Sequence, residues 1–458
     1  MSKRGMHRSI LAIALPAMLT NVATALFGLA DMWVIGRLGD ASAQGAVEIG
    51  AKLLTTLFVL FNFLRSSTVA LTAQAAGKQA AGREHEPVQA QILVRALVLA
   101  LAVGALLIAA MPLAIAVGLQ MFGASGRVAA LARTYVGIRY WGGLPWLLNA
   151  VLTGWLIGRR RVRAVLAVEV GSNLLHIALD LSLVLGLHLA VVGVALATLT
   201  SESGKLIALM TVAAREAPAR GAAAAVRDRT SWSAKAFMRL LALNRDLFGR
   251  TVLLMAAVVL LTRAGAEQGA VVLAANAILY QLFMLSTLVL DGYESAAQVL
   301  CGEALGAGRK GAFVRQVRAI LAWGGATALV ITLVYAVFGA RLASSFSTVP
   351  EVIRTARTYI GWAVLTPAVG VVSFVLDGVF IGSSWTRAML LSMVAAIAGF
   401  VILLIVARPF GNHGLWLAFC LFFLLRAAGQ AALLPGLIRR SFGGAAEGLQ
   451  AVEIGRSA

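Results

Sequence analysis

The sequence has few charged residues, few acidic side chains and almost no cysteine. Only 13% of its 458 residues are charged, whereas 60% are hydrophobic, and the mean hydropathy is +0.89. This composition excludes a soluble globular domain and a disordered chain, because both need far more polar surface. The two cysteines, Cys301 and Cys420, fall in separate predicted helices, so we expect no disulfide.

Signatures of nucleotide and metal chemistry are also missing. No GxxxxGK[ST] motif occurs, so no ATPase signature is visible. Gly306, Gly308 and Gly311 spell GxGxxG, but they follow an apolar helix and not a strand, which argues against a dinucleotide site. We find no metal-ligand spacing, nucleophile elbow or soluble domain. The sequence therefore predicts neither an enzyme nor a receptor, and no cofactor or resident metal.

Long apolar runs dominate what is present. A membrane span needs about 20 apolar residues, and the sequence predicts an all-α integral membrane protein with twelve such helices. We place them at residues 10–36, 46–75, 88–118, 128–157, 164–186, 190–213, 241–263, 270–300, 318–340, 351–381, 388–408 and 414–436. The apolar run after the basic N-terminus is too long for a signal peptide, so we expect a retained first helix.

The net charge of +20 is distributed unevenly along the chain. With the N-terminus inside, basic residues crowd the cytoplasmic segments. The outer loops hold only Arg37, Arg127, Arg263, Arg341 and Arg408. This positive-inside pattern predicts that both termini are cytoplasmic, and it points to anionic membrane lipid, not nucleic acid, as the partner of the basic residues.

The chain matches itself at a constant shift of 224 residues. ARTYVG at 132–137 aligns with ARTYIG at 356–361, and LTGWLIGRRRVRAVL at 152–166 aligns with LDGVFIGSSWTRAML at 376–390. Six spans fit into that shift, and because six is even, both halves insert in the same orientation. Parallel repeats of this kind are typical of transporters whose two lobes rock around a substrate.

The repeat sets the expected domains. We predict an N-terminal six-helix lobe at 1–213, a cytoplasmic linker at 214–240, a C-terminal six-helix lobe at 241–440 and a cytoplasmic tail at 441–458.

Ionisable residues inside the apolar runs of the first lobe mark the candidate site. His176 and Asp180 are four positions apart and share a helix face. Asp31 and Thr198 fall at a comparable depth in the outer half of the membrane. Such groups are costly in hydrocarbon and are functional hypotheses by default. The alternatives are a satisfied core hydrogen bond for the His176 pair and an interfacial helix end for Asp31.

The second half has no such acids at the matching positions. The residues 224 positions after Asp31 and Asp180 are Met255 and Leu404, both apolar. Two carboxylates in one apolar cavity repel each other, which favours binding of a proton or another cation by the pair. We therefore expect cation coupling in the first lobe, with Pro16 as a place where the first helix bends.

A second polar set lies toward the cytoplasmic half. It comprises Arg65, Asp291, Glu294 and Asp377. Our hypothesis is an inter-lobe gate in which Arg65 pairs with Asp291 or Glu294 when the transporter opens outward. Static pairing within one lobe is an equally open interpretation.

Several motifs in order along the chain resemble one family. They are LADMWVIGRLG around Asp31, NFLRSSTVALTAQAAG after the second helix, NLLHIALDLSLVLGL and GVALAT in the fifth and sixth helices, LDGYESAAQVLCGEALGAGRKG in the eighth, and LDGVFIGSSWTRAM in the tenth. Over essentially its whole length the chain resembles the multidrug and toxic compound extrusion (MATE) transporters, and within them the DinF-like branch.

The resemblance implies a V-shaped pair of lobes that export amphipathic, often cationic compounds by alternating access, driven by proton or sodium influx. It implies that Asp31 is the coupling acid, Asp180 its partner and Thr198 the hydroxyl beside them. One position departs from the pattern, since His176 stands where Asn is expected. A hard sodium ion prefers oxygen ligands, so the histidine favours protons.

We expect a monomeric, proton-coupled multidrug antiporter in a bacterial inner membrane. A sodium-coupled antiporter and a lipid-linked precursor flippase of the same superfamily are the alternatives. A flippase would be expected to have a more cationic cavity, against which the embedded acids argue.

Overall fold

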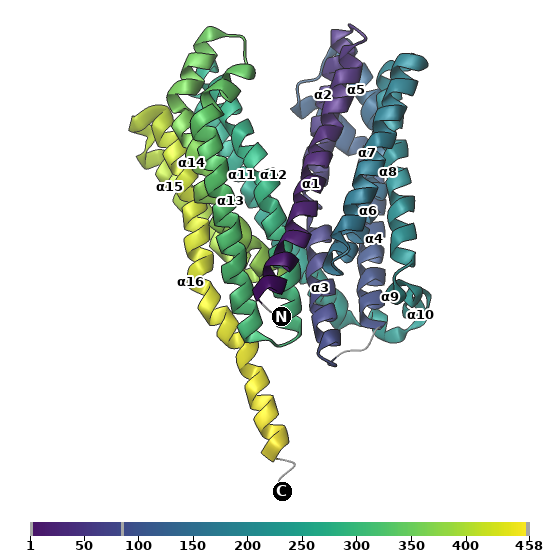
Figure 1. The fold of residues 1–458 in the computed structure, drawn as a ribbon. Coiled ribbons are helices and arrows are strands. Elements are labelled where there is room, and N and C mark those ends of the chain that lie inside the picture. Colours follow the sequence, from purple (N-terminus) through teal and green to yellow (C-terminus); the bar gives the residue numbers. More distant parts are fainter. Residues whose placement is uncertain (1–2, 84–86, 455–458) are drawn as a thin grey trace. The chain divides into compact units, whose positions relative to one another are not determined.

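Residues 3–83 and 87–454 are described in a computed structural model, and they are almost entirely helical (Figure 1). Apolar runs fold as helices because a helix satisfies its backbone hydrogen bonds internally. The first half contains α1 (Lys3–Gly36), α2 (Ala41–Val59), α3 (Phe63–Ala80), α4 (Pro87–Met121), α5 (Gly126–Arg139), α6 (Gly143–Gly158), α7 (Val162–Asp180) and α8 (Ala190–Ala214). The second half contains α11 (Ala234–Ala266), α12 (Ala270–Gly306), α13 (Lys310–Ser345), α14 (Pro350–Gly382), α15 (Thr386–Val406) and α16 (Gly411–Ile454).

Short elements join these helices. They are the 3₁₀ turn η1 (Tyr140–Gly142), the π-helix η2 (Leu181–Gly186), the short helices α9 (Ala217–Arg220) and α10 (Ala222–Arg227), and the 3₁₀ turns η3 (Arg229–Trp232) and η4 (Arg408–Phe410). The predicted tail at 441–458 continues α16 as far as Ile454, and residues 455–458 lie outside the described part.

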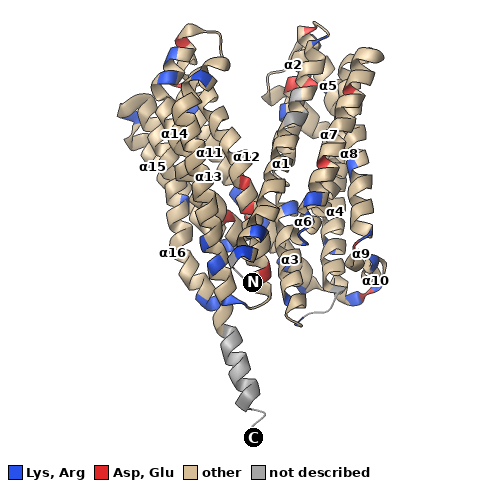
Figure 2. Cartoon of the chain, viewed as in Figure 1, with Lys and Arg blue, Asp and Glu red and all other residues tan. Residues whose placement is uncertain are grey.

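The prediction of an all-α membrane protein is confirmed. Among the described residues, eleven segments are long and apolar enough to cross a membrane. The predicted span at 128–157 is α5 and α6 on either side of η1, and neither helix alone reaches span length. Figure 2 shows long uncharged stretches on the helices, with charged residues gathered mainly toward helix ends.

By its internal contacts the chain divides into two units. Unit 1 contains Met1–Met18, Ala73–Arg83 and Arg245–Ala458, and unit 2 contains Leu19–Thr72 and Glu84–Asn244. The start of α1 and the end of α3 thus count with the second half of the chain. The predicted lobe boundaries place both segments in the first lobe, and those boundaries stay a prediction.

The internal repeat is visible in the backbone. Gly154 in α6 packs its Cα on the backbone carbonyl of Arg65, and Gly378 in α14 packs on that of Glu294. Arg160 and Ser384, which are also 224 positions apart, both have a left-handed backbone, at φ 63° and 58°. Each unit therefore repeats the same close helix packing and the same helix-ending turn.

The predicted linker at 214–240 forms α9, α10, η3 and the start of α11, and by its contacts it belongs to unit 2. Arg95 Nε in α4 donates to the Ser231 carbonyl at 2.6 Å. Arg159 and Arg161 contact the Glu216 carboxylate at 2.9 and 2.7 Å. Burial of the Glu216 carboxyl disfavours its charge, but the hydrogen bonds from both arginines outweigh burial and hold its pKa below the ordinary value.

Candidate functional site

The candidate site lies in unit 2, where α1 and α7 meet. His176 Nε2 is 2.7 Å from Asp31 Oδ1 and 3.1 Å from Asp180 Oδ2. All three side chains are buried, with exposed fractions of 3% or less. The helix spacing predicted that His176 and Asp180 would share a face of α7, and the structure adds Asp31 from a helix 145 positions earlier. Asp31 thus belongs to the buried cluster, and its depth in the membrane stays a prediction.

The hydrogen bonding of this cluster is incomplete. A single Nε2–H group can be directed well at only one acceptor, and its bond goes to Asp31. Asp180 Oδ2 lies 3.1 Å from the same nitrogen, so two buried carboxylates share one Nε2–H donor. Shared donation leaves the buried carboxylates incompletely satisfied, which is unfavourable, and a proton or another cation could complete the cluster.

Helix α8 supplies hydroxyl groups on the other side of His176. The Thr198 hydroxyl donates to the Val194 carbonyl at 3.1 Å, within its own helix. Ser201 Oγ lies 3.4 Å from His176 Nδ1 and 3.0 Å from the Thr198 carbonyl. The Thr198 backbone carbonyl thus accepts a hydrogen bond from Ser201, and the Ser201 hydroxyl is the one that faces the imidazole. Sequence reasoning missed Ser201, although it lies one helical turn after Thr198.

Helix α5 adds two more residues that sequence reasoning missed. Tyr135 is fully buried, and its hydroxyl accepts a hydrogen bond from Arg139 Nη1 at 2.5 Å. Both residues interact electrostatically with Asp31. Arg139 could have been found from the sequence, because an arginine within the apolar run at 128–157 is itself a functional signal.

The side chains of Asp31, His176 and Asp180 could together also bind a cation. One ligand atom from each of Asp31, His176 and Asp180 lies within 4.8 Å of the others. A sodium ion would have to accept the imidazole nitrogen between the two carboxylates, and hard cations prefer oxygen. The arrangement suits a proton better, since imidazole and carboxylate both exchange protons.

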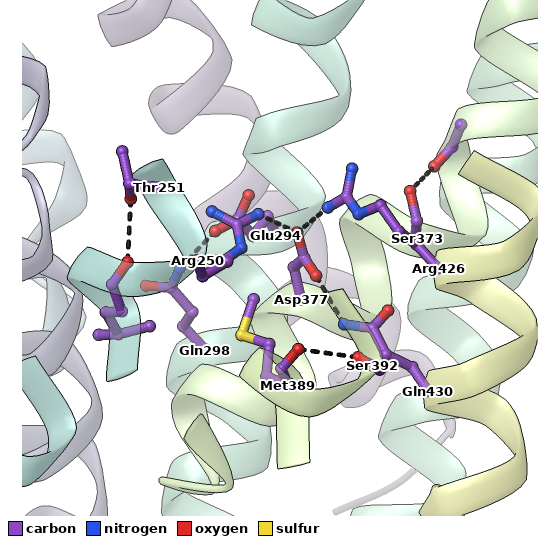
Figure 3. Close-up of polar contacts among 12 residues, drawn as sticks. Arg250, Thr251, Glu294, Gln298, Ser373, Asp377, Met389, Ser392, Arg426 and Gln430 are labelled. Carbon is purple, nitrogen blue, oxygen red and sulfur yellow. Dashed lines mark hydrogen bonds and ion pairs between the residues drawn. The ribbon is translucent and has the colours of Figure 1, made fainter. Parts of the chain in front are cut away.

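A second charged cluster lies in unit 1, and Figure 3 shows it around Asp377. Arg250 from α11 and Arg426 from α16 both donate to Asp377 Oδ2, the latter at 2.6 Å, and Gln430 Nε2 donates to Oδ1 at 2.6 Å. Asp377 is completely buried. Its partners all belong to its own unit, which is the static pairing that the sequence left open.

The other predicted gate residues are placed as follows. Arg65 lies in unit 2, whereas Asp291 and Glu294 lie on α12 in unit 1. Glu294 Oε1 accepts a hydrogen bond from Gln298 Nε2 at 2.8 Å. The inter-lobe pairing of Arg65 stays a prediction. Pro16 lies inside α1, which continues as one helix across it, so the predicted bend also stays a prediction.

Known proteins provide an independent comparison. The sequence model of one family, described as MatE, matches residues 16–182 and 249–407. These two stretches fall in the two halves of the repeat, and together they cover most of the chain.

Individual relatives agree with that match. The chain is 37% identical to the DNA damage-inducible protein F of Escherichia coli K12, over 92% of this chain and 90% of that protein. It is 30% identical to the "Probable multidrug resistance protein NorM" of Bradyrhizobium diazoefficiens, over 45% of this chain and 44% of that one. A crystal structure of MATE in the bent conformation superposes with a TM-score of 0.84 at 18% identity, covering 95% of this chain and 97% of that one. The last comparison supports the two-lobe fold alone.

Proposed function

Since the chain belongs to the MatE family of membrane transporters, we propose that it exports amphipathic, often cationic small molecules by alternating access, with proton influx as the driving force. The family's members are transporters and not enzymes. The Bradyrhizobium relative, whose name is "Probable multidrug resistance protein NorM", supports the choice of substrate class.

The observation that carries the proposal is the buried Asp31–His176–Asp180 cluster. In the outward-facing state a proton binds this cluster, where Asp31 and Asp180 share the single Nε2–H group of His176. Protonation lowers its negative charge and weakens its attraction for a cationic substrate, which leaves. The return inward releases the proton and admits new substrate. Coupling requires only that the proton and the substrate have different affinities for the two states.

His176 supports the proton over sodium. The imidazole nitrogen lies between the two carboxylates at 2.7 and 3.1 Å. A sodium-coupled antiporter is the second candidate, because carboxylates also suit sodium. A lipid-linked precursor flippase fits less well, because the buried acids of unit 2 would repel phosphate.

We infer a bacterial inner membrane as the location, with both termini cytoplasmic, from the positive-inside pattern of the sequence. A monomer is sufficient, since the cluster is built entirely from one chain.

The test is efflux of a cationic dye from proteoliposomes that contain the purified protein. One arm imposes a proton gradient without sodium, and the other imposes a sodium gradient without a pH difference. We expect transport with protons alone, and its loss in Asp31→Asn. Asp40→Asn is the matched control, since Asp40 caps α2 through the backbone amides of Ser42 and Ala43, a role that Asn also fills. Transport only with sodium would contradict proton coupling, and transport with neither gradient would favour the flippase.

A further inference from the structure

The charged cluster around Asp377 in unit 1 takes no part in the proposed proton site. It combines two guanidinium groups, those of Arg250 and Arg426, with the Asp377 carboxylate (Figure 3). The positions 224 residues before Arg250 and Asp377 are Leu26 and Thr153, both uncharged. Charges inside a membrane protein are costly, so each needs a reason. The second half of the chain therefore has buried charges of its own to explain.

Arg426 on α16 has most of its hydrogen-bond donors unused. Its side chain is only 2% exposed, and its Nη2 donates to Asp377 Oδ2 at 2.6 Å. Its Nε and Nη1 atoms are buried and make no hydrogen bond to any described residue. These two atoms carry the larger share of the five N–H groups of a guanidinium. In Figure 3 one terminal nitrogen of Arg426 is directed at Asp377 and the other points away from it.

The aromatic rings beside Arg426 do not replace the missing acceptors. Its guanidinium carbon lies 5.6 Å from the ring centroid of Phe422 and 5.2 Å from that of Phe423. Such rings attract a positive charge. An N–H group directed at a ring is nevertheless a much weaker hydrogen bond than one directed at an anion. The rings therefore stabilise the charge of Arg426 and leave its donors unsatisfied.

The other members of the cluster do not supply an acceptor either. Asp377 already accepts on both oxygens, from the two arginines on Oδ2 and from Gln430 on Oδ1. Gln430 Oε1 and Arg250 Nε are buried without a hydrogen bond to any described residue. Glu294 lies beside Arg250 in Figure 3. Buried donors are normally satisfied, so we expect the acceptor for Arg426 to come from a bound molecule.

An aromatic wall lies one helical turn from these charges. Phe374 precedes Asp377 by three positions on α14, and Phe423 precedes Arg426 by three on α16. The ring centroids of Phe374 and Phe423 are 5.7 Å apart, and that of Phe283 from α12 lies 5.3 Å from Phe423. Phe374 is only partly buried, so the wall reaches the surface of unit 1. A ligand with one negative group and an aromatic ring matches this combination.

We propose that unit 1 contains an anion site, in which Arg426 Nε and Nη1 donate to a monovalent anion. The anion is either chloride from solution or the carboxylate of an aromatic amphipathic substrate. Asp377 holds Arg426 Nη2, which leaves the other two nitrogens directed at the anion. A doubly charged anion fits less well, because the Asp377 carboxylate would repel its second charge.

The inference goes beyond the proposed function, which concerns cationic substrates and a proton site in unit 2. A carboxylate subsite in unit 1 extends the range of exported compounds to zwitterionic and anionic ones. A chloride site instead makes the folded protein dependent on the anion in the medium. Both sources share one chemistry, which is a single negative charge that accepts hydrogen bonds from Arg426.

The test measures anion binding to the purified full-length protein in detergent, without transport. Thermal unfolding is followed by tryptophan fluorescence while sodium gluconate is replaced stepwise by sodium chloride or by sodium benzoate. The sodium concentration and the ionic strength stay constant. A ligand that binds only the folded protein raises the unfolding temperature as its concentration rises. Gluconate is the reference because it is bulky, strongly hydrated and has no ring.

The decisive variant is Arg426→Lys, which keeps a positive charge beside Asp377 but loses the planar set of donors. We expect the anion concentration for half of the response to rise roughly tenfold or more. Arg357→Lys is the matched control, because Arg357 is an exposed arginine of α14 that donates to Ser344 Oγ. It should respond like wild type. Asp31→Asn should also respond like wild type, so failure of the proton site would not affect this result.

Phe374→Leu separates the two sources of the anion. It leaves every hydrogen bond of the Asp377 cluster in place, so the response to chloride should persist. If the site takes a substrate carboxylate, benzoate acts on wild type and acts more weakly on Phe374→Leu, because the ring contact is lost. A response of wild type to chloride alone supports a halide site. Phe374→Leu is also expected to fold if Arg426→Lys does not.

Two results would overturn the inference. If wild type shows no concentration-dependent rise with either anion, the donors of Arg426 are satisfied by water and no anion site exists. If Arg426→Lys and Arg357→Lys respond equally, the anions act on the protein surface and not at Arg426. Both results leave proton-coupled efflux untouched.

Discussion

Asp31 on α1 and His176 on α7 are in hydrogen-bond contact at 2.7 Å, although 145 positions separate them in the chain. The contact ties the first helix of the first repeat to its fifth. Asp180, the other acid within reach of the same nitrogen, comes from the fifth helix itself. The proposed proton site is therefore formed only when α1 and α7 are packed together.

The first prediction concerns His176. His176→Gln keeps a polar side chain but loses the group that exchanges protons between the carboxylates. We expect proton-driven dye efflux to fall on the order of a hundredfold. His188→Asn is the control, because His188 is exposed at a left-handed position, φ 55°, that Asn tolerates. Equal proton-driven efflux in His176→Gln and wild type would show that the imidazole takes no part.

The second prediction concerns Asp377 in unit 1. Asp377→Asn leaves the guanidinium groups of Arg250 and Arg426 without their shared carboxylate. Breaking a buried ion pair in this way typically costs about 3 to 5 kcal/mol, so we expect a clear drop in thermal unfolding temperature in detergent. Asp40→Asn should change it little. If Asp377→Asn unfolds at the wild-type temperature but loses transport, Asp377 belongs to the gate instead.

The third prediction concerns the glycine that packs α14 on α12. A Cβ on Gly378 would lie 2.3 Å from the Glu294 carbonyl oxygen, whereas nothing lies within 4 Å of one on Gly361 in the same helix. Gly378→Leu should therefore lower the yield of folded protein strongly, and Gly361→Leu should not. The comparison is made by size-exclusion chromatography after mild solubilisation. Equal yields would contradict the close packing of the two helices.

The fourth prediction concerns pH and the linker. The folded-state pKa of Glu216 is lowered from its ordinary value of 4.5. A lowered pKa contributes stability that is present above pH 4.5 and is lost as the pH falls through the folded-state value. A spin label at Ala223 should therefore become more mobile as the solution is acidified below that pH. In Glu216→Gln the label should be mobile at neutral pH and insensitive to acid. Wild-type behaviour of this variant would show that the ion pairs of Glu216 do not hold the linker in place.

Much of this could be predicted from the sequence, for physical reasons. Apolar runs about as long as a membrane span predict helices. Matches at a constant shift of 224 residues predict a repeat, so the all-α fold with two repeated halves followed directly. His176 and Asp180 were found because a spacing of four is a local property of one helix. Ser201 and the orientation of Arg139 depend on how α5 and α8 pack against α7, which no local pattern encodes. The partners of Asp377 come from α11 and α16, and for the same reason the sequence left its pairing open.

The π-helical turn η2 directly follows Asp180, and it has a consequence for the alignment of the two halves. Gly158 and Gly382 are 224 positions apart, but α8 begins at Ala190 and α16 at Gly411, which are only 221 apart. The first half thus carries three additional residues in the stretch that contains η2, whereas α15 is α-helical from Thr386 to Val406. An alignment with the corresponding gap pairs Lys205 with Arg426. The last helix of each half thus carries a basic residue at the matched position, and its acidic partner differs between the halves, Glu169 in one and Asp377 in the other.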